Sequence, residues 1–336
     1  MMRTDICDLF GIEHPIVLAG MGGVSMAPLV AAVANAGGLG VIGAAMLDPD
    51  ALRRQIRKTR TLTDRPFAVD LLAPIPDMIR PHIQVLVEER VKIFVAGLAV
   101  PGEFIAEMHE HGMIVVVMVG KVHHAQSAEA AGADVVAAQG TEAGGHTGEI
   151  GTLALVPQVV DAVKIPVLGA GGIADGRGIA AVLALGAEGA VVGTRFIATP
   201  EATAAPSYRA ALVRATETDT VRTRCYTGKP ARAIRNPYIA EWEGRASEIQ
   251  KFPLQVMHSM QEGVMDYMGY TGDADPDRTF MPAGQGLGLI REIKPAAEVM
   301  GDLVRETEEA LARLDALASR GRRPGPPPAA ARRHSA

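Results

Sequence analysis

The sequence predicts an α/β fold, a (β/α)8 TIM barrel, from three observations. Eight short apolar runs recur between residues 16 and 192. Each run is nearly continuous in apolar residues and is bounded by Gly, Pro or charge, as is typical of a parallel strand buried on both faces. Helix-compatible sequence, such as 27–37 and 123–133, fills most gaps between the runs. Eight strands with helical crossovers favour a closed barrel, with an open doubly wound sheet as the alternative.

The expected strands cover 16–20, 40–43, 67–71, 92–96, 113–118, 134–138, 166–169 and 189–192. We expect the barrel to comprise residues 1–215 and 284–319, with a last helix over 289–319. In segment 216–283 the alternation of apolar runs and helical patterns stops, and this segment carries much of the aromatic content. We expect it to form a lid or subdomain over the barrel mouth, or a surface excursion that packs on the barrel. The Pro- and Ala-rich tail, 320–336, is expected to be disordered.

Composition restricts the class of protein. A chain of 336 residues suits one large α/β domain, and its net charge of −5 provides no basic footprint for nucleic acid. Cys7 and Cys225 lie outside any CxxC pair, which argues against a zinc site and for a reducing compartment. The N-terminus lacks the apolar run of a signal peptide, and apolar stretches are interrupted before the roughly 18 residues of a membrane helix. We expect a cytoplasmic protein that does not bind a membrane.

Two glycine-containing turns predict a phosphate site. Active-site residues of a barrel follow the carboxyl ends of its strands, and the loops after strands 7 and 8 commonly bind phosphate. Gly171–Gly172 follows the seventh expected strand, and Gly193–Thr194 follows the eighth. Glycine permits positive φ and close backbone approach, and exposed N–H groups there bind an anion. Turn geometry alone is the alternative explanation of these glycines.

The densest polar cluster is the glycine-rich loop 139–148, which follows the sixth expected strand. Its histidine, His146, is the predicted catalytic residue, because a neutral imidazole at the barrel mouth can act as a general base or bind a substrate oxygen. Fixing the local backbone is the alternative. The other histidines have no such context, and no metal site is predicted. Lys121, directly after strand 5, is a weak candidate for an aldolase or isomerase.

These motifs resemble the flavin-barrel family of nitronate monooxygenases, formerly called 2-nitropropane dioxygenases. The resemblance rests on Gln139-Gly-Thr-Glu-Ala-Gly-Gly-His146, Ala-Gly171-Gly172-Ile and Val192-Gly193-Thr194. It extends over roughly residues 5–300 and includes the opening HPIVLAGMGG, the pattern AGGLGVIG and AGQGLG at 283–288. FMN-dependent enoyl-ACP reductases share most of these motifs, so the resemblance is specific for the superfamily and less so for the reaction.

The resemblance implies FMN as the cofactor and His146 as the active-site histidine. It implies that residues 20–22 and 70 contact the flavin, that Gln139 and Gly144 flank the isoalloxazine and that Gln285 closes the site. With the glycine turns, the expected FMN contacts are Gly20, Met21, Gly22, Asp70, Gln139, Gly144, Gly145, Gly171, Gly172, Val191, Val192, Gly193, Thr194 and Gln285. Many relatives have Asn where this chain has Asp70. An ionised Asp can only accept a hydrogen bond, so Asp70 is expected to accept one from a flavin N–H or ribityl hydroxyl.

Three functions follow as hypotheses. The first is a nitronate monooxygenase, which uses O2 to convert a small alkyl nitronate to a carbonyl compound and nitrite. The second is an NAD(P)H-dependent FMN reductase of an enoyl thioester or a quinone. No G-x-G-x-x-G with a following acidic residue marks a tight nicotinamide site, but transient docking over FMN needs none. The third is a non-catalytic flavin- or phosphate-binding barrel. The sequence leaves open whether the chain forms a homodimer.

Overall fold

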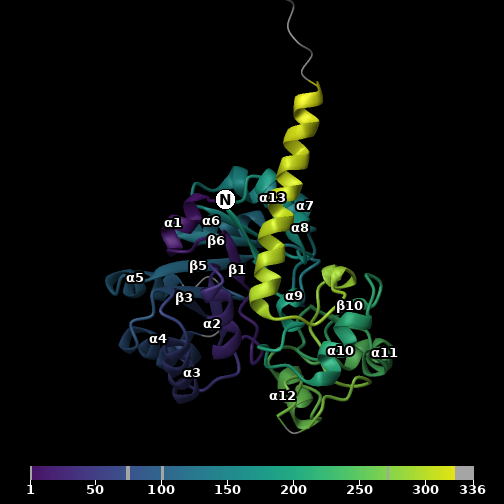
Figure 1. The fold of residues 1–336 in the computed structure, drawn as a ribbon. Coiled ribbons are helices and arrows are strands. Elements are labelled where there is room, and N and C mark those ends of the chain that lie inside the picture. Colours follow the sequence, from purple (N-terminus) through teal and green to yellow (C-terminus); the bar gives the residue numbers. More distant parts are fainter. Residues whose placement is uncertain (1, 73–75, 100–101, 271, 322–336) are drawn as a thin grey trace, which may run out of the picture.

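The computed structural model describes residues 2–72, 76–99, 102–270 and 272–321 (Figure 1). Within them, eight parallel strands form one sheet in the order β1-β9-β8-β6-β5-β4-β3-β2. A single parallel bridge between Val17 and Leu39 brings β2 to β1, so the barrel is nearly closed. This arrangement confirms the predicted (β/α)8 barrel and excludes the open sheet.

The barrel strands match the eight expected runs to within two residues at each end. They are β1 (Ile16–Leu18), β2 (Gly40–Gly43), β3 (Phe67–Leu72), β4 (Ile93–Gly97), β5 (Ile114–Val119), β6 (Val135–Gln139), β8 (Val167–Ala170) and β9 (Gly189–Val192). The helices are α1 (Asp5–Phe10), α2 (Ala27–Asn35), α3 (Pro49–Leu62), α4 (Pro76–Glu88), α5 (Gly102–Glu110), α6 (Val122–Ala130), α7 (Thr152–Ala162), α8 (Gly176–Ala184), α9 (Thr194–Ile197), α10 (Pro206–Arg214), α11 (Pro237–Glu243), α12 (Leu254–Gln261) and α13 (Ala296–Gly321), with short 3-10 turns η1 (Ala246–Glu248) and η2 (Gln285–Leu289).

The strands are apolar throughout because each buries both faces. Alternate residues such as Val41, Ala68 and Ile93 fill the barrel interior, and the residues between them pack under the outer helices. Ile6 and Phe10 of α1 belong to the same interior cluster and close the amino-terminal end of the barrel. Full burial of one such aliphatic side chain contributes about 1.5–3 kcal/mol, which makes the lower barrel a rigid base for the site above it.

At the carboxyl ends of the strands, the residues that face the barrel interior become small. The two-residue alternation places Gly43, Gly97 and Gly193 on the inner face, in the same layer as Asp70. A Cβ at Gly43 would lie 2.3 Å from the Met21 carbonyl oxygen, so only glycine fits there. Small residues in this layer leave the upper barrel open, whereas the lower layers are filled.

Segment 216–283 forms a compact unit beside the barrel mouth (Figure 1). Its strands β10 (Thr220–Thr223) and β11 (Ala231–Ile234) pair antiparallel, and β11 also pairs with β7 (Gly145–His146) of the barrel. An aromatic cluster underlies this small sheet. The Tyr226 ring stacks on Tyr238 at 5.3 Å and lies 4.6 Å from Phe280. The aromatic residues of the segment therefore form a core of their own.

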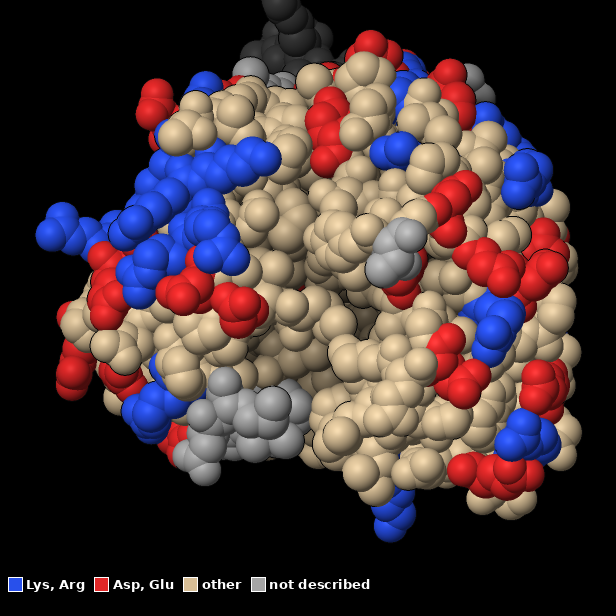
Figure 2. Space-filling model, turned by 90° about the horizontal axis from the view of Figure 1, so that it is seen from below, with Lys and Arg blue, Asp and Glu red and all other residues tan. Residues whose placement is uncertain are grey.

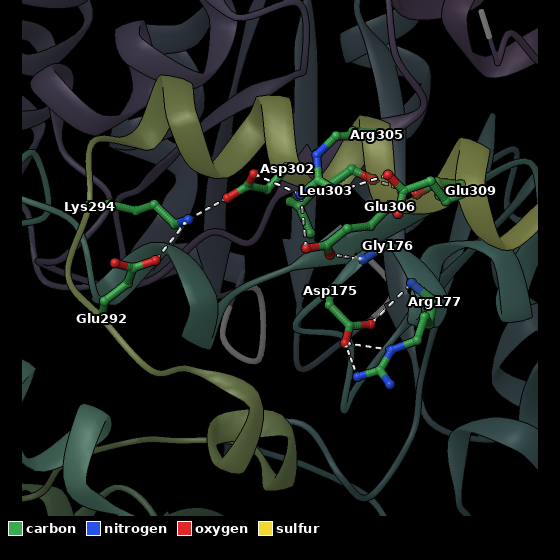
Figure 3. A network of polar contacts seen from close by, with 11 residues as sticks. Asp175, Gly176, Arg177, Glu292, Lys294, Asp302, Leu303, Arg305, Glu306 and Glu309 are labelled. Carbon is green, nitrogen blue, oxygen red and sulfur yellow. Dashed lines mark hydrogen bonds and ion pairs between the residues drawn. The ribbon is translucent and has the colours of Figure 1, made fainter.

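Two carboxylates cap the N-terminus of α8, and one of them, Glu306, comes from the long helix α13 (Figure 3). The Glu306 carboxylate accepts a hydrogen bond from Gly176 N at 3.0 Å, and Asp175 accepts from Arg177 N at 3.0 Å. These carboxylates satisfy N–H groups that the first turn of α8 leaves unpaired and lie at the positive end of the helix dipole. Protein side chains therefore already occupy the N-terminus of α8.

The expected start of the last helix, residue 289, is wrong. Residues 285–289 form η2, and α13 begins at Ala296, directly after Pro295. A proline disfavours helical geometry in the residue before it, which keeps Lys294 out of the helix. The Glu201 carboxylate then accepts from Ala296 N at 3.1 and 3.2 Å. Of the expected tail, residues 322–336 lie outside the described residues. No helix in the described ranges is long and apolar enough to cross a membrane.

Replacing Glu306 tests the attachment of α13. Glu306→Gln should lower the free energy of unfolding by about 1 kcal/mol, because a charged partner of the α8 N-terminus is lost. Thermal unfolding should then shift down by roughly 2 °C. Glu309→Gln is the matched control, since Glu309 pairs only with the exposed Arg305 and should have little effect. Equal shifts in both variants would contradict the assigned role of Glu306.

Candidate functional site

A cavity of about 730 Å³ opens at the carboxyl ends of the barrel strands. It is the hollow at the centre of Figure 2, surrounded mainly by uncharged residues. The barrel loops form one side, and Val256, Met257 and Met260 of α12 lie on the other. Among its described lining residues there is no Lys or Arg, and Asp70 is the only carboxylate. The site can therefore hold a large, mostly apolar ligand, and any anionic group must be bound by backbone N–H groups.

The structure brings most of the predicted site residues to this cavity. Those that line it are Gly20, Met21, Gly22, Asp70, Gln139, Gly144, Gly145, His146, Gly171, Gly172, Val191, Gly193 and Thr194. Val192 does not, because its side chain is fully buried between the barrel and the outer helices. The Gln285 side chain is exposed outside the lining, to which its neighbours Gly284 and Gly286 contribute instead.

The two glycine turns lie side by side, because β8 and β9 are neighbours in the sheet. Gly171 and Gly172 have φ of 106° and 71°, which favours glycine at both positions. A Cβ at Gly171 would also lie 2.8 Å from Thr152 Oγ1. The Thr194 hydroxyl accepts a hydrogen bond from Gly284 N at 3.0 Å, so its own proton is free to donate. Since α8 is already capped, an anion in this corner would bind the glycine turns and the Thr194 hydroxyl.

Glu142 holds the loop that carries His146. Its carboxylate accepts hydrogen bonds from Thr152 N at 2.9 and 3.0 Å and from Thr152 Oγ1 at 2.8 Å. Its carbonyl accepts from Gln285 N at 2.9 Å. A Cβ at Gly144 would lie only 2.8 Å from the Ala283 carbonyl carbon. The loop is therefore anchored to α7 and to the AGQGLG segment, which acts here through its backbone.

His146 is positioned by segment 216–283. Strand pairing sets Ala231 opposite His146, and the Gln139 side chain donates to the His146 carbonyl at 3.0 Å. His146 Nε2 lies 3.0 Å from Thr227 Oγ1, and the Thr227 hydroxyl donates to the Lys229 carbonyl at 3.0 Å. Because that bond uses the only hydroxyl proton, Nε2 must carry a proton and donate to Thr227. Nδ1 is therefore the lone-pair nitrogen.

The imidazole is neutral at physiological pH. Burial, with a smaller effect of the nearby Lys229 ammonium, lowers the pKa of His146 to about 4. Nδ1 has no protein partner within the described residues and is not among the fully buried polar atoms, so it is accessible in the cavity that His146 lines. His146 thus presents a proton acceptor to the cavity.

Asp70 is the second group in the cavity whose pKa is strongly shifted. A Cβ at Gly20 would lie 2.1 Å from Asp70 Oδ2, which shows how closely the carboxyl packs on the first barrel loop. Its Oδ1 is buried and has no protein partner. Burial raises the pKa of Asp70 to about 8. Its Oδ2 also lacks a partner among the described residues but is not fully buried, so a ligand in the cavity that Asp70 lines can supply the partner of the carboxyl group.

These features match a flavin mononucleotide. Backbone N–H groups and Thr194 suit its phosphate, the glycine layer of Gly43, Gly97 and Gly193 leaves room for a flat ring, and Asp70 offers a polar contact to that ring. The sequence model of a protein family described as nitronate monooxygenase matches residues 3–306 of the chain. The chain belongs to the nitronate monooxygenase family. This family is flavin-dependent, in agreement with the chemistry of the cavity.

Proteins similar to this chain are named for different activities. A dehydrogenase of Rhodococcus jostii, named for a hydroxy-methyl-oxo-octahydro-indene-carboxyl-CoA, is 34% identical over 94% of this chain and 98% of its own. The structure of FabK from Thermotoga maritima is 39% identical, with a TM-score of 0.87, and covers 94% of this chain and all of that one. Nitroalkane oxidase of Streptomyces ansochromogenes is 34% identical, with a TM-score of 0.84, over 92% and 99%.

Several site residues were not predicted from the sequence, some in the barrel, such as His82 and Gly97, and others in segment 216–283. Thr227 binds the His146 ring through Nε2, and the Tyr267 hydroxyl donates to the Gly22 carbonyl at 2.8 Å. The α12 residues line the outer cavity. The only sequence signal was the turn TGKP at 227–230, which does not show what it contacts. Within the described ranges, no group of three or more His, Cys, Asp or Glu could hold a metal ion.

Removing the Thr227 hydroxyl tests how the His146 ring is held. Thr227→Val keeps the shape but removes the acceptor of the Nε2 proton, so turnover should fall by about tenfold or more while flavin content stays unchanged. Thr227→Ser is the matched control and should retain most activity because it restores the hydroxyl. Equal activity of the Val and Ser variants in steady-state assays would argue against this contact.

The low pKa of His146 predicts a pH dependence of stability. The unfolded chain binds a proton at His146 near pH 6.5, whereas the folded chain resists it to about pH 4. Stability should therefore fall as pH drops through this window, and His146→Gln should lose less thermal stability between pH 7 and pH 5 than the wild type. Parallel melting curves of the two proteins across this range would rule out the assigned protonation state.

Proposed function

We propose that the chain is an FMN-dependent oxidoreductase that oxidises nitroalkanes and their nitronates with O2 to a carbonyl compound and nitrite. The observation that supports this reaction is the neutral His146, which turns an acceptor nitrogen to the cavity while Thr227 binds its Nε2 proton. A neutral imidazole can receive the α-proton of a nitroalkane, which is the step that forms the nitronate. Oxidation of the nitronate is redox chemistry that FMN supplies when bound.

The residues of the chain have separate roles in this proposal. The Gly171–Gly172 and Gly193–Thr194 turns hold the phosphate through backbone N–H groups and one hydroxyl. His146 Nδ1 accepts the substrate proton, and the Gln139 amide keeps its segment in place. Met257 and Met260 form part of the apolar wall of the outer cavity. The other role expected from the sequence, a hydrogen bond from His146 to a substrate oxygen, is disfavoured because Nδ1 carries no proton to donate.

A second candidate function is the NAD(P)H-dependent reduction of an enoyl thioester or a quinone. The observation that favours it is the apolar outer cavity, whose lining includes Met46 and Leu47 as well as the α12 residues. Such a surface suits an acyl chain or a prenylated ring. The Rhodococcus relative, whose name contains a carboxyl-CoA thioester, also supports a thioester substrate. The two candidates share the flavin site and differ in what reduces the flavin.

A comparison of two substrate forms tests the role of His146. With a neutral nitroalkane, His146→Gln should lower kcat/KM by about 100-fold or more, because a general base is lost. With the preformed nitronate the loss should stay below about tenfold, because the α-proton is already gone. The readouts are O2 uptake and nitrite release, with flavin content measured in each variant. His111→Gln, at an exposed histidine outside the cavity lining, is the control.

Two outcomes would contradict the proposal. Equal losses with nitroalkane and nitronate would remove His146 from proton transfer. No O2 uptake with either substrate, together with rapid bleaching of the flavin by NADH or NADPH under anaerobic conditions, would replace the nitronate reaction by the reductase. Bleaching by nitronate alone supports the nitronate reaction.

A further inference from the structure

We infer that Asp70 faces the flavin as a neutral carboxylic acid and donates a hydrogen bond to an acceptor atom of its ring system. The inference rests on the proposed FMN site and adds the direction of one contact in it. An ionised Asp70, as expected from the sequence, would accept a hydrogen bond instead. The two arrangements require different partner atoms: a donor needs a carbonyl oxygen or an unprotonated ring nitrogen, whereas an acceptor needs a ring N–H or a ribityl hydroxyl.

The position of Asp70 follows from the register of the barrel. It lies opposite Gly43 of β2 and Val95 of β4, and the alternation along β3 turns its side chain inward above Ala68. A Cβ at Gly97 would lie 3.6 Å from Oδ1. Glycines thus flank the carboxyl group, which leaves it open to a ligand lying on the glycine layer and provides no side-chain partner.

No cation faces this carboxyl group from the elements packed around it. The cavity lining, as far as the structure describes it, contains no Lys or Arg. Its other titratable groups are two histidines and two tyrosines. His146 is neutral, and His82 Nε2 lies 2.8 Å from the Leu47 carbonyl. The Tyr208 and Tyr267 hydroxyls donate to the carbonyls of Pro282 and Gly22, so neither proton is available to Asp70.

Desolvation without a compensating charge favours the protonated form of a carboxyl group. Burial alone raises the pKa of Asp70 from 3.8 to about 8, so the group is mostly protonated at pH 7. Neither carboxyl oxygen has a protein partner among the described residues, and Oδ2, unlike Oδ1, is not fully buried, so an acid proton on Oδ2 needs an acceptor from the cavity. A ring carbonyl or ring nitrogen of the flavin satisfies that need. Contact with a neutral donor also avoids placing a second negative charge beside a cofactor that already carries a phosphate.

Three measurements on the holoprotein test the inference. Infrared spectra recorded between pH 6 and pH 10 should show the C=O stretch of a protonated carboxylic acid that disappears with an apparent pKa near 8 and is absent in Asp70→Asn. The visible spectrum of bound FMN should shift over the same pH range in the wild type. Asp70→Asn, which keeps an N–H donor at this position, should retain FMN and show no such shift. Asp161→Asn, at an exposed aspartate, is the matched control and should behave as the wild type.

Stability provides a readout that does not require the cofactor. The folded chain keeps the Asp70 proton up to about pH 8, whereas the unfolded chain loses it near pH 3.8. Between these values the unfolded state binds fewer protons, so stability falls as pH rises. The advantage of Asp70→Asn over the wild type in thermal unfolding of the apoprotein should grow from about pH 4 to pH 8 and then stay constant. An advantage that does not change with pH would overturn the inference.

The outcomes separate this inference from the proposed function. If the purified protein binds no FMN, the proposed function fails, while the infrared band and the stability of the apoprotein still report the state of Asp70. If FMN binds but no acid band is found, or if Asp70→Asn abolishes FMN binding whereas Asp70→Glu retains it, Asp70 acts as a carboxylate and the inference is wrong. An acid band with an unchanged flavin spectrum across pH 6–10 would show that Asp70 does not contact the ring.

Discussion

The site depends on one interaction, the pairing of β7 with β11. A two-residue strand from a barrel loop is bound to a hairpin from a segment more than 80 residues later. That pairing fixes the backbone of His146, and the turn that precedes β11 brings Thr227 to its ring. It also holds segment 216–283 beside the barrel mouth, where α12 lines the cavity. Without it, the catalytic loop would be a glycine-rich connection with no defined side-chain direction.

Electrostatics at this site come from burial more than from charge pairs. With no Lys or Arg in the described lining, two titratable groups are driven to their neutral forms, His146 by loss of a proton and Asp70 by retaining one. The same desolvation shifts the two pKa values in opposite directions, which separates a proton acceptor from a proton donor in one cavity. Backbone N–H groups at the glycine turns are then left to bind the anionic part of the ligand. The cavity suits a cofactor with a phosphate at one end and a neutral ring at the other.

The strands could be predicted because burial on both faces imposes the same apolar pattern wherever they lie in the barrel. The start of α13 could not, since apolar spacing at 289–295 matched a helix while Pro295 and the turn η2 excluded one. The strands β7, β10 and β11 were missed because they are short and gain their stability from one another. Val192 and Gln285 were expected to contact FMN because they lie within the motifs Val192-Gly193-Thr194 and AGQGLG. The alternation of β9 turns Val192 outward, and the AGQGLG segment contributes Gly284 and Gly286 in place of the glutamine side chain.

The sequence by itself determined the barrel, the two glycine turns and the loop that carries His146. These features are local, because a buried strand and a tight turn each depend on a few adjacent residues. Tertiary structure alone decided the protonation states of His146 and Asp70, the identity of Thr227 as a partner and the composition of the outer cavity. Each of these depends on burial or on contacts between distant segments, which strand periodicity and motif spacing do not encode. The glycine turns therefore indicate where a phosphate can bind, and the folded chain decides what faces the other end of the ligand.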